Sequence, residues 1–294
     1  MNILLLGKGG QVGWELQRAL APLGTVIAHD LDTADFSQPE QVAALVAAVR
    51  PDVIVNAAAH TAVDKAEGEP ELARLINATT PGAIAREAAK LGALLVHYST
   101  DYVFDRSGSA PRDEAAPTAP LSVYGSTKLE GEQLIQASGC PHLILRTSWV
   151  FGARGGNFAK TMLKLAAERE ALKVINDQVG APTGADLLAD VTAHAIRGIQ
   201  ARPELSGLYH MVAGGQTTWY DYARFVIEWA RAKGVAIKVE PGAISPVPTT
   251  EYPTPARRPL NSRLNTTKLQ QAFGLTLPDW QSGVERMLTE HLGD

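Results

Sequence analysis

A glycine-rich stretch near the N-terminus constrains the fold more than any other feature. The apolar run 2–6 leads into Gly7-Lys8-Gly9-Gly10-Gln11-Val12-Gly13, and a helical pattern follows at 14–20. Glycines at such a turn let the backbone approach a pyrophosphate, which the positive end of the following helix attracts. Because these glycines lie between a first strand and a first helix, they predict a dinucleotide-binding site that includes Gly7 and Gly10.

The first half of the chain alternates apolar runs with helical patterns. This alternation is typical of a parallel sheet covered by helices. We therefore expect an α/β fold, with a Rossmann-type doubly wound parallel sheet in residues 1–150 and a smaller C-terminal α/β substrate domain in residues 151–294. The predicted strands are 2–6, 25–29, 53–55, 94–98 and 142–146, and one long helix is predicted over 70–91.

Composition excludes several classes of function. The net charge of −4 and the pI near 6.0 argue against a nucleic-acid-binding surface. The apolar start of the chain meets the glycine turn too early for a signal peptide or a membrane span, so no membrane partner is expected. Cys140 is the only cysteine, which rules out an intrachain disulfide and fits a reducing compartment. We expect a cytoplasmic protein.

The predicted second strand ends at Asp30, whose carboxylate could accept a hydrogen bond from a ribose 2′-hydroxyl. This favours NADH over NADPH, because a 2′-phosphate would meet that negative charge, although Lys8 could partly compensate. The alternative is that Asp30 is only a turn residue at a strand end. Asp35 and Phe36 follow at positions that could border the adenine. Asp64, Lys65 and Glu67 are expected on a solvated face.

Tyr124 and Lys128 are four residues apart, so on a helix they share one face. An ammonium there would stabilise the phenolate and lower the pKa of the phenol. Thr100 ends the predicted fourth strand at the ligand-binding edge of the sheet and could bind the same substrate oxygen. Such a trio suits proton delivery to a carbonyl oxygen while hydride reaches its carbon. The alternative is an ordinary surface pair.

Several segments together resemble the extended short-chain dehydrogenase/reductase family: the glycine cluster, 56–59, 99–104 and Tyr124-x-x-x-Lys128. Within that family, segments 56–67, 146–150, 176–183 and 258–264 are similar to the branch that reduces dTDP-4-dehydrorhamnose. The resemblance implies NAD(P)H-dependent reduction of the C4 keto group of dTDP-4-dehydro-L-rhamnose to dTDP-L-rhamnose, a precursor of cell-surface polysaccharide. It also implies that segments around 172–200 return to the first domain.

The resemblance assigns roles to individual residues. Tyr124 is implied as the proton donor, Lys128 as the residue that lowers its pKa and binds the nicotinamide ribose, and Thr100 as the binder of the reacting oxygen. Asp101 and Trp149 match substrate positions. The matched cofactor positions are Gly10, Gln11, Val12, Asp30, Asp35, Phe36, Ala59, His60, Thr61 and Tyr98.

A metal site is implied by some relatives, which form dimers through Mg²⁺ held by carboxylates. The matching residues are Glu15, Asp186 and Glu290, and oxygen ligands suit Mg²⁺. Asp186 departs from the longer glutamate of those relatives. Three solvated carboxylates are the alternative interpretation, so a Mg²⁺-linked homodimer and a metal-free chain both stay open.

The C-terminal half gives weaker signals. Trp219, Tyr220 and Tyr222 are expected to pack, while the arginines 257, 258 and 263 could face a nucleotide diphosphate or simply the solvent. Two other functions stay open on the same scaffold. One is a nucleotide-sugar epimerase or dehydratase with tightly held NAD. The other is a non-catalytic NAD(P)-binding regulatory subunit, like that of methionine adenosyltransferase.

Overall fold

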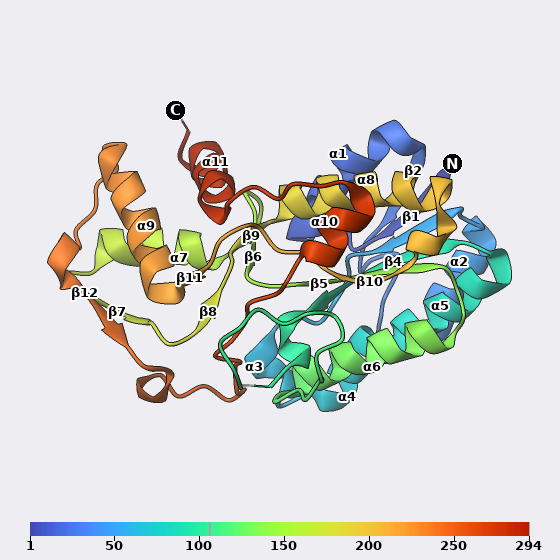
Figure 1. Ribbon diagram of the computed structural model, residues 1–294, viewed down its shortest axis with the longest axis horizontal. Coiled ribbons are helices and arrows are strands. Elements are labelled where there is room, and N and C mark those ends of the chain that lie inside the picture. The colour runs from blue at the N-terminus through green and yellow to red at the C-terminus, as the bar shows by residue number, and fades with distance from the viewer. Residues whose placement is uncertain (106, 294) are drawn as a thin grey trace.

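The computed structural model describes residues 1–105 and 107–293 (Figure 1). Arg106 and Asp294, the last residue of the predicted second domain, lie outside the described residues. Within the described ranges, no helix is both long enough and apolar enough to cross a membrane.

Six parallel strands form the largest sheet, in the order β10-β5-β4-β3-β1-β2. The α/β fold predicted from the sequence is confirmed. The strand order reverses between β1 and β3. The crevice outside the carboxyl ends of these two strands is therefore the topological switch point, where ligands of open α/β sheets bind. The strands are β1 (Asn2–Leu6), β2 (Thr25–His29), β3 (Val53–Asn56), β4 (Leu94–Thr100), β5 (His142–Thr147) and β10 (Gly207–His210).

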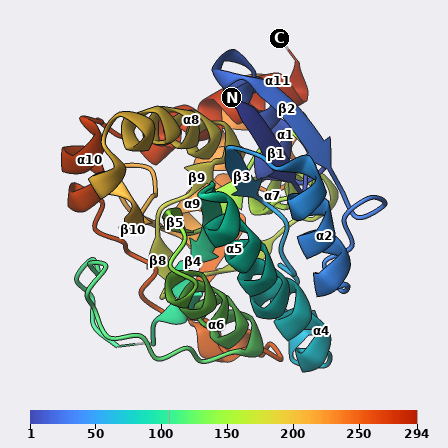
Figure 2. The same ribbon diagram turned by 90° about the vertical axis from the view of Figure 1, so that its right-hand side faces the viewer.

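Helices cover both faces of this sheet, as alternating side chains of β1 require. Ile3 and Leu5 pack toward α1 and α8, whereas Leu4 and Leu6 pack toward α2, α5 and α6. Figure 2 shows α2, α5 and α6 side by side on one face. The helices are α1 (Gln11–Leu20), α2 (Pro39–Val49), α3 (Val63–Ala66), α4 (Pro70–Arg74), α5 (Thr80–Leu91), α6 (Val123–Ala137), α8 (Ala185–Ala201) and α10 (Thr267–Phe273).

The single helix predicted over 70–91 is interrupted. A π-helical segment, Leu75–Thr79, separates α4 from α5. Its wider turn brings Asn77 against α6, where the Asn77 amide donates to the Thr127 hydroxyl at 3.2 Å. Gly131 of α6 makes this approach possible, because a Cβ there would lie 2.2 Å from the Asn77 carbonyl oxygen.

The C-terminal part combines three helices with three two-stranded sheets, β7–β12, β8–β11 and β6–β9. Tyr222, Val226 and Trp280 belong to its buried core. The helices are α7 (Phe158–Glu168), α9 (Trp219–Ala232) and α11 (Trp280–Leu292), and the strands are β6 (Val150–Phe151), β7 (Leu172–Ile175), β8 (Val179–Gly180), β9 (Thr183–Gly184), β11 (Thr217–Thr218) and β12 (Ile244–Val247). Short 3₁₀ turns occupy Ala21–Leu23, Asp101–Val103, Pro203–Leu205, Pro241–Ala243 and Thr249–Glu251.

Candidate active site

The start of α6 is fixed against the end of β4. Ser122 caps the helix by accepting a hydrogen bond from the Gly125 amide at 3.1 Å, and the Glu67 carboxylate accepts from the Val123 amide at 2.8 Å. A Cβ on Gly125 would meet the Tyr102 carbonyl oxygen at 2.2 Å. Glu67, expected on a solvated face, is therefore part of the support of α6.

Thr100 and Asp101 lie at the carboxyl end of β4 and are almost fully buried. The Thr100 hydroxyl accepts from the Tyr102 amide and donates to Asp101 Oδ1, both at 3.2 Å. Asp101 Oδ2 has no hydrogen-bond partner among the described residues. Burial raises the pKa of Asp101 to about 7, and hydrogen bonds from Ser262 and Thr100 oppose the rise. This edge therefore presents an unsatisfied polar atom beside the Thr100 hydroxyl.

Tyr124 is on the first turn of α6, with its ring edge-on to Tyr102 at 5.5 Å between centroids. Desolvation raises the pKa of Tyr124 to about 12; the Thr100 hydroxyl lowers it and the Asp101 charge raises it. The sequence predicted the opposite direction, with Lys128 lowering this pKa. That prediction is wrong for this structure, because burial penalises the phenolate and Lys128 makes no resolved contribution.

Lys128 is only 2% exposed, and its ammonium group is turned toward β4. Nζ donates to the Tyr98 carbonyl oxygen at 2.6 Å and lies 3.1 Å from His97 Nε2. Burial lowers the pKa of Lys128 to about 8, while Glu132 raises it. Lys128 thus stands one helical turn from Tyr124 with its charge disfavoured by its surroundings.

The glycine turn lies at the switch point and has the geometry that a pyrophosphate needs. Gly7 adopts φ +84°, and a Cβ on Gly13 would meet the Gly7 carbonyl oxygen at 1.9 Å. Gly10 is the N-cap of α1 and supplies no side-chain cap, which leaves the helix N-terminus open to a ligand. Asp30 Oδ2 accepts from the Gly9 amide at 2.8 Å, so this carboxylate stands directly beside the turn. These residues fit a dinucleotide.

Two of the other predicted cofactor residues, His60 and Phe36, are held through their backbone by neighbouring side chains. Asn77 holds His60 at both its amide, at 2.9 Å, and its carbonyl, at 3.1 Å. The Phe36 carbonyl accepts from Thr80 at 2.6 Å. Tyr98 differs, because its hydroxyl lies 2.6 Å from Thr192 of α8 and only its carbonyl oxygen faces Lys128. The remaining positions lie at the starts of the segments after β1, β2 and β3: Gln11, Val12, Asp35, Ala59 and Thr61.

A cavity of about 300 Å³ is lined mainly by residues of the C-terminal part, and Tyr102, from the turn after β4, completes its wall. Trp219 lines it and stacks on Trp149, with 3.7 Å between ring centroids, and the Trp219 indole N–H donates to Gln178 at 3.0 Å. Trp149 itself has φ +49°, an uncommon backbone conformation for a bulky residue. The sequence predicted only packing for Trp219 and did not single out Gln178. Neither contact follows from a local pattern, because residues 149, 178 and 219 are far apart in the chain.

Arg258 lines the same cavity and is anchored from one side. Its Nη2 donates to Asp64 Oδ2 at 2.7 Å, and Asp64 also accepts from the Ala256 amide at 3.1 Å. Arg258 Nη1 is buried without a hydrogen-bond partner in the described part of the chain. Asp64, expected on a solvated face, therefore orients an arginine that has a free donor for an anion.

The three predicted metal ligands gather around arginines. Arg286 pairs with Asp186 at 3.3 Å and with Glu290 at 3.1 Å, and Arg18 pairs with Glu15 at 3.4 Å. Among residues 1–105 and 107–293, no group of three metal-binding side chains is found. Within one chain each of these three carboxylates is paired with an arginine.

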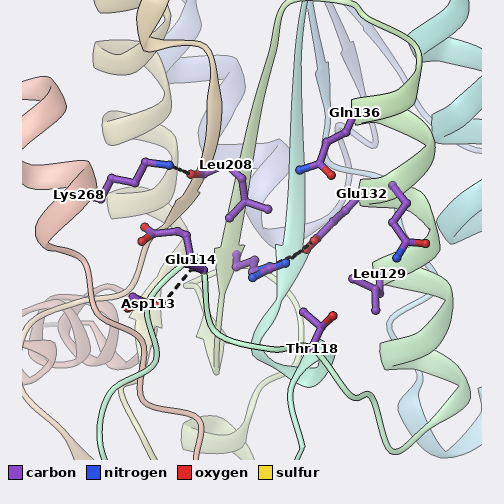
Figure 3. Close-up of a pocket in the computed structure, with 11 residues that line it drawn as sticks. Asp113, Glu114, Thr118, Leu129, Glu132, Gln136, Leu208 and Lys268 are labelled. Atoms are coloured by element: carbon purple, nitrogen blue, oxygen red, sulfur yellow. Dashed lines mark hydrogen bonds and ion pairs between the residues drawn. The ribbon is translucent and has the colours of Figure 1, made fainter.

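A second, larger cavity of about 690 Å³ lies elsewhere and includes none of the predicted site residues. Figure 3 shows it between α6, β5 and the segment that carries Lys268. Its wall contains the buried Arg146–Glu132 ion pair, at 2.6 Å, the exposed Asp113 and the half-buried Glu114. Size alone therefore does not locate the chemistry in this molecule.

The fold and the position of the site define a class, the extended short-chain dehydrogenases/reductases, which use NAD(P). The family model "RmlD substrate binding domain" matches residues 1–292. The chain is 63% identical over 294 residues to the dTDP-4-dehydrorhamnose reductase of Escherichia coli K12, covering 99% of this chain and 98% of that one. It belongs to the dTDP-4-dehydrorhamnose reductase family.

Solved structures agree with this assignment. The dTDP-4-dehydrorhamnose reductase from Bacillus anthracis, determined in complex with NADP, is 34% identical, with a TM-score of 0.88 and coverage of 98% of this chain and 99% of that one. The Thermus thermophilus UDP-glucose 4-epimerase, in complex with NAD, has a TM-score of 0.80 at 20% identity over 100% of this chain and 99% of that one. The second likeness concerns the fold alone.

Proposed function

We propose that this chain reduces the C4 keto group of dTDP-4-dehydro-L-rhamnose to the hydroxyl of dTDP-L-rhamnose, using NAD(P)H. The observation that carries the proposal is the convergence of Thr100 and Tyr124 at the carboxyl edge of β4, in a chain that belongs to this family. NAD(P)H supplies the hydride that forms the new C–H bond at C4.

Two side chains of the protein would stabilise the substrate oxygen O4 and supply its proton. The Thr100 hydroxyl and the Tyr124 phenol are donors for the negative charge that develops on O4. With a pKa of about 12, Tyr124 holds its proton throughout the neutral range, as a proton donor must. Tyr124 transfers that proton to O4, and the phenolate left behind regains one from solvent before the next turnover.

The cofactor would be held around the switch point. Gly7, Gly10, Gln11 and Val12 would hold the pyrophosphate, and Asp30 the adenosine ribose. Asp35 and Phe36 would border the adenine, while Ala59, His60, Thr61, Tyr98 and Lys128 would face the nicotinamide side. The charge of Asp30 beside the Gly9 amide supports a preference for NADH. Comparing kcat/KM for NADH and NADPH tests it; an equal or higher value for NADPH contradicts it.

The substrate would lie between Tyr124 and the cavity beside Tyr102. Asp101 and Trp149 would contact the sugar side, and the free donor of Arg258 supports a diphosphate in the cavity. In this arrangement residues 1–150 bind the cofactor, with help from segments around 172–200, and residues 151–294 mainly bind the nucleotide sugar.

NADH oxidation in the presence of dTDP-4-dehydro-L-rhamnose is the direct test. We expect stoichiometric formation of NAD⁺ and dTDP-L-rhamnose, with no oxidation when the keto sugar is omitted. Co-purified NAD with no net NADH consumption would favour an epimerase or dehydratase instead. Capture of a partner enzyme by a chain without reductase activity would favour a regulatory subunit.

Oligomeric state and metal binding need a separate measurement. The arginines that pair with Glu15, Asp186 and Glu290 support the interpretation of these residues as solvated carboxylates. Molecular mass in Mg²⁺, with and without a chelator, tests for a Mg²⁺-linked homodimer: a mass that halves on chelation supports the dimer. The cytoplasmic location remains a prediction.

A further inference from the structure

Tyr102, in the 3₁₀ turn after β4, contacts both the edge of the large sheet and the cavity of the C-terminal part. Its amide donates to the Thr100 hydroxyl at 3.2 Å. Its ring meets the Tyr124 ring edge-on, with 5.5 Å between centroids and 79° between planes. The same residue lines the cavity together with Arg258. Tyr102 therefore touches both parts of the proposed site.

The backbone of Tyr102 is fixed on two sides. Besides the bond from its amide to Thr100, its carbonyl oxygen packs against Gly125 of α6, where a Cβ would approach it to 2.2 Å. Because Gly125 directly follows Tyr124, this contact sets how closely the turn approaches the first turn of α6. The Tyr102 side chain consequently starts from a backbone that is fixed relative to both proposed donors, Thr100 and Tyr124.

The phenol end of Tyr102 is close to charges of opposite sign. Burial raises the pKa of Tyr102, the Asp101 charge adds to the rise and Arg258 opposes it, so the phenol keeps its O–H at neutral pH. Arg258 has its own buried donor, Nη1, without a partner among the described residues, while Asp64 holds its Nη2 at 2.7 Å. The charge of Asp101 works against an anion here, and that of Arg258 offsets it. A phenol O–H and a guanidinium on one cavity wall suit a phosphate oxygen.

The shape of the proposed substrate matches this arrangement. In a dTDP-sugar the phosphate is attached at C1, across the pyranose ring from the C4 keto group. In the proposed function C4 reacts beside Thr100 and Tyr124, and the diphosphate lies near Arg258. Tyr102 spans the same interval, because its ring contacts Tyr124 and its phenol end is close to Arg258. The sugar would therefore lie along the Tyr102 side chain.

We propose that the Tyr102 hydroxyl donates to the phosphate next to the sugar, while the Tyr102 ring holds Tyr124 in position. Tyr102 is thus a substrate-binding residue through its hydroxyl and a positioning residue through its ring. The inference rests on the proposed function, because it needs a nucleotide diphosphate in the cavity. A phosphate bound to Tyr102 restrains the ring against which Tyr124 packs, so a group remote from C4 contributes to the orientation of the proton donor.

Binding of dTDP and of dTMP, measured by isothermal titration calorimetry without turnover, tests the role of the hydroxyl. Because dTMP lacks the outer phosphate, Tyr102→Phe should weaken dTDP binding roughly 10-fold and leave dTMP binding near its wild-type value. Tyr209→Phe is the matched control, since it removes a phenol hydroxyl that donates to the Leu205 carbonyl, away from the cavity. Unchanged dTDP affinity in Tyr102→Phe, or equal weakening for dTDP and dTMP, would overturn the proposal.

The outcomes separate this inference from the proposed function. A wild-type chain that reduces the keto sugar, combined with unchanged dTDP affinity in Tyr102→Phe, would remove the role of Tyr102 and leave the proposed reduction intact. Failure of the wild-type chain to bind dTDP would overturn both.

Steady-state kinetics separate the hydroxyl from the ring. Tyr102→Phe keeps the ring, so KM for the keto sugar should rise roughly 10-fold with kcat close to wild type. Tyr102→Leu removes the ring edge from Tyr124, so kcat should also fall, by roughly 10-fold. NADH affinity, measured by fluorescence titration, should stay near wild type in both variants. Equal kcat values in the two variants would contradict the positioning role of the ring. The calorimetric test needs only the isosteric Tyr102→Phe variant, so it decides the proposal even where Tyr102→Leu fails to fold.

Discussion

The edge of the large sheet and the cavity in the C-terminal part hold their polar groups in different ways. At the edge, Thr100, Asp101 and Lys128 are at most 5% exposed, and backbone amides and carbonyls fix two of them. In the cavity, Arg258 and Tyr252 come from loops, and Tyr252 is 55% exposed. The edge is organised before any ligand arrives, as the proposed proton transfer requires, whereas the cavity proposed for the nucleotide is lined partly by exposed loop residues.

The largest effect should come from the edge. Tyr124→Phe removes the proton donor but keeps the ring, so kcat should fall by roughly 10²–10⁴ while cofactor affinity stays close to wild type. Steady-state assays with NADH titrations separate the two quantities. Near-normal turnover by this variant would contradict the assignment of proton transfer to Tyr124 at the sheet edge.

Lys128→Ala should affect the edge in two ways. We expect weaker NADH binding, because the side chain would contact the nicotinamide ribose, together with slower turnover. Fluorescence titration measures the first and a saturating assay the second. Thr127→Ser, on the same turn of α6, is the control for general disturbance of the helix. Unchanged affinity and rate would reject the double role of Lys128.

The cavity should respond with a smaller and different change. Arg258→Gln removes a charged donor that would face the substrate diphosphate, so KM for the keto sugar should rise roughly 10- to 100-fold with kcat less affected. Arg257→Gln changes the exposed neighbour and should leave KM near its wild-type value. A loss confined to kcat in Arg258→Gln would place this arginine at the edge rather than in the cavity.

Local patterns explain what the sequence could predict. Three features could be predicted because each depends only on residues close in sequence: the glycine turn, Thr100 and the Tyr124–Lys128 pair. Their placement at one edge of the sheet then follows from the order of the strands and helices. The cavity depends on contacts between distant segments, such as Trp149 on Trp219, and no local pattern reports these. The direction of the Tyr124 pKa shift was predicted wrongly for the same reason, since the burial that raises this pKa arises only in the folded chain.

One feature of the sheet bears on how the chain is made. β10, from residues 207–210, pairs with β5 in parallel, and α8 packs over β1 and β5 through Leu188 and Ile196. When only the first 150 residues have emerged from the ribosome, β5 therefore still lacks its neighbour β10, and one apolar face of the sheet lacks α8. Co-translational folding of the nucleotide-binding half must wait for about sixty further residues to emerge, and a fragment cut at residue 150 should aggregate.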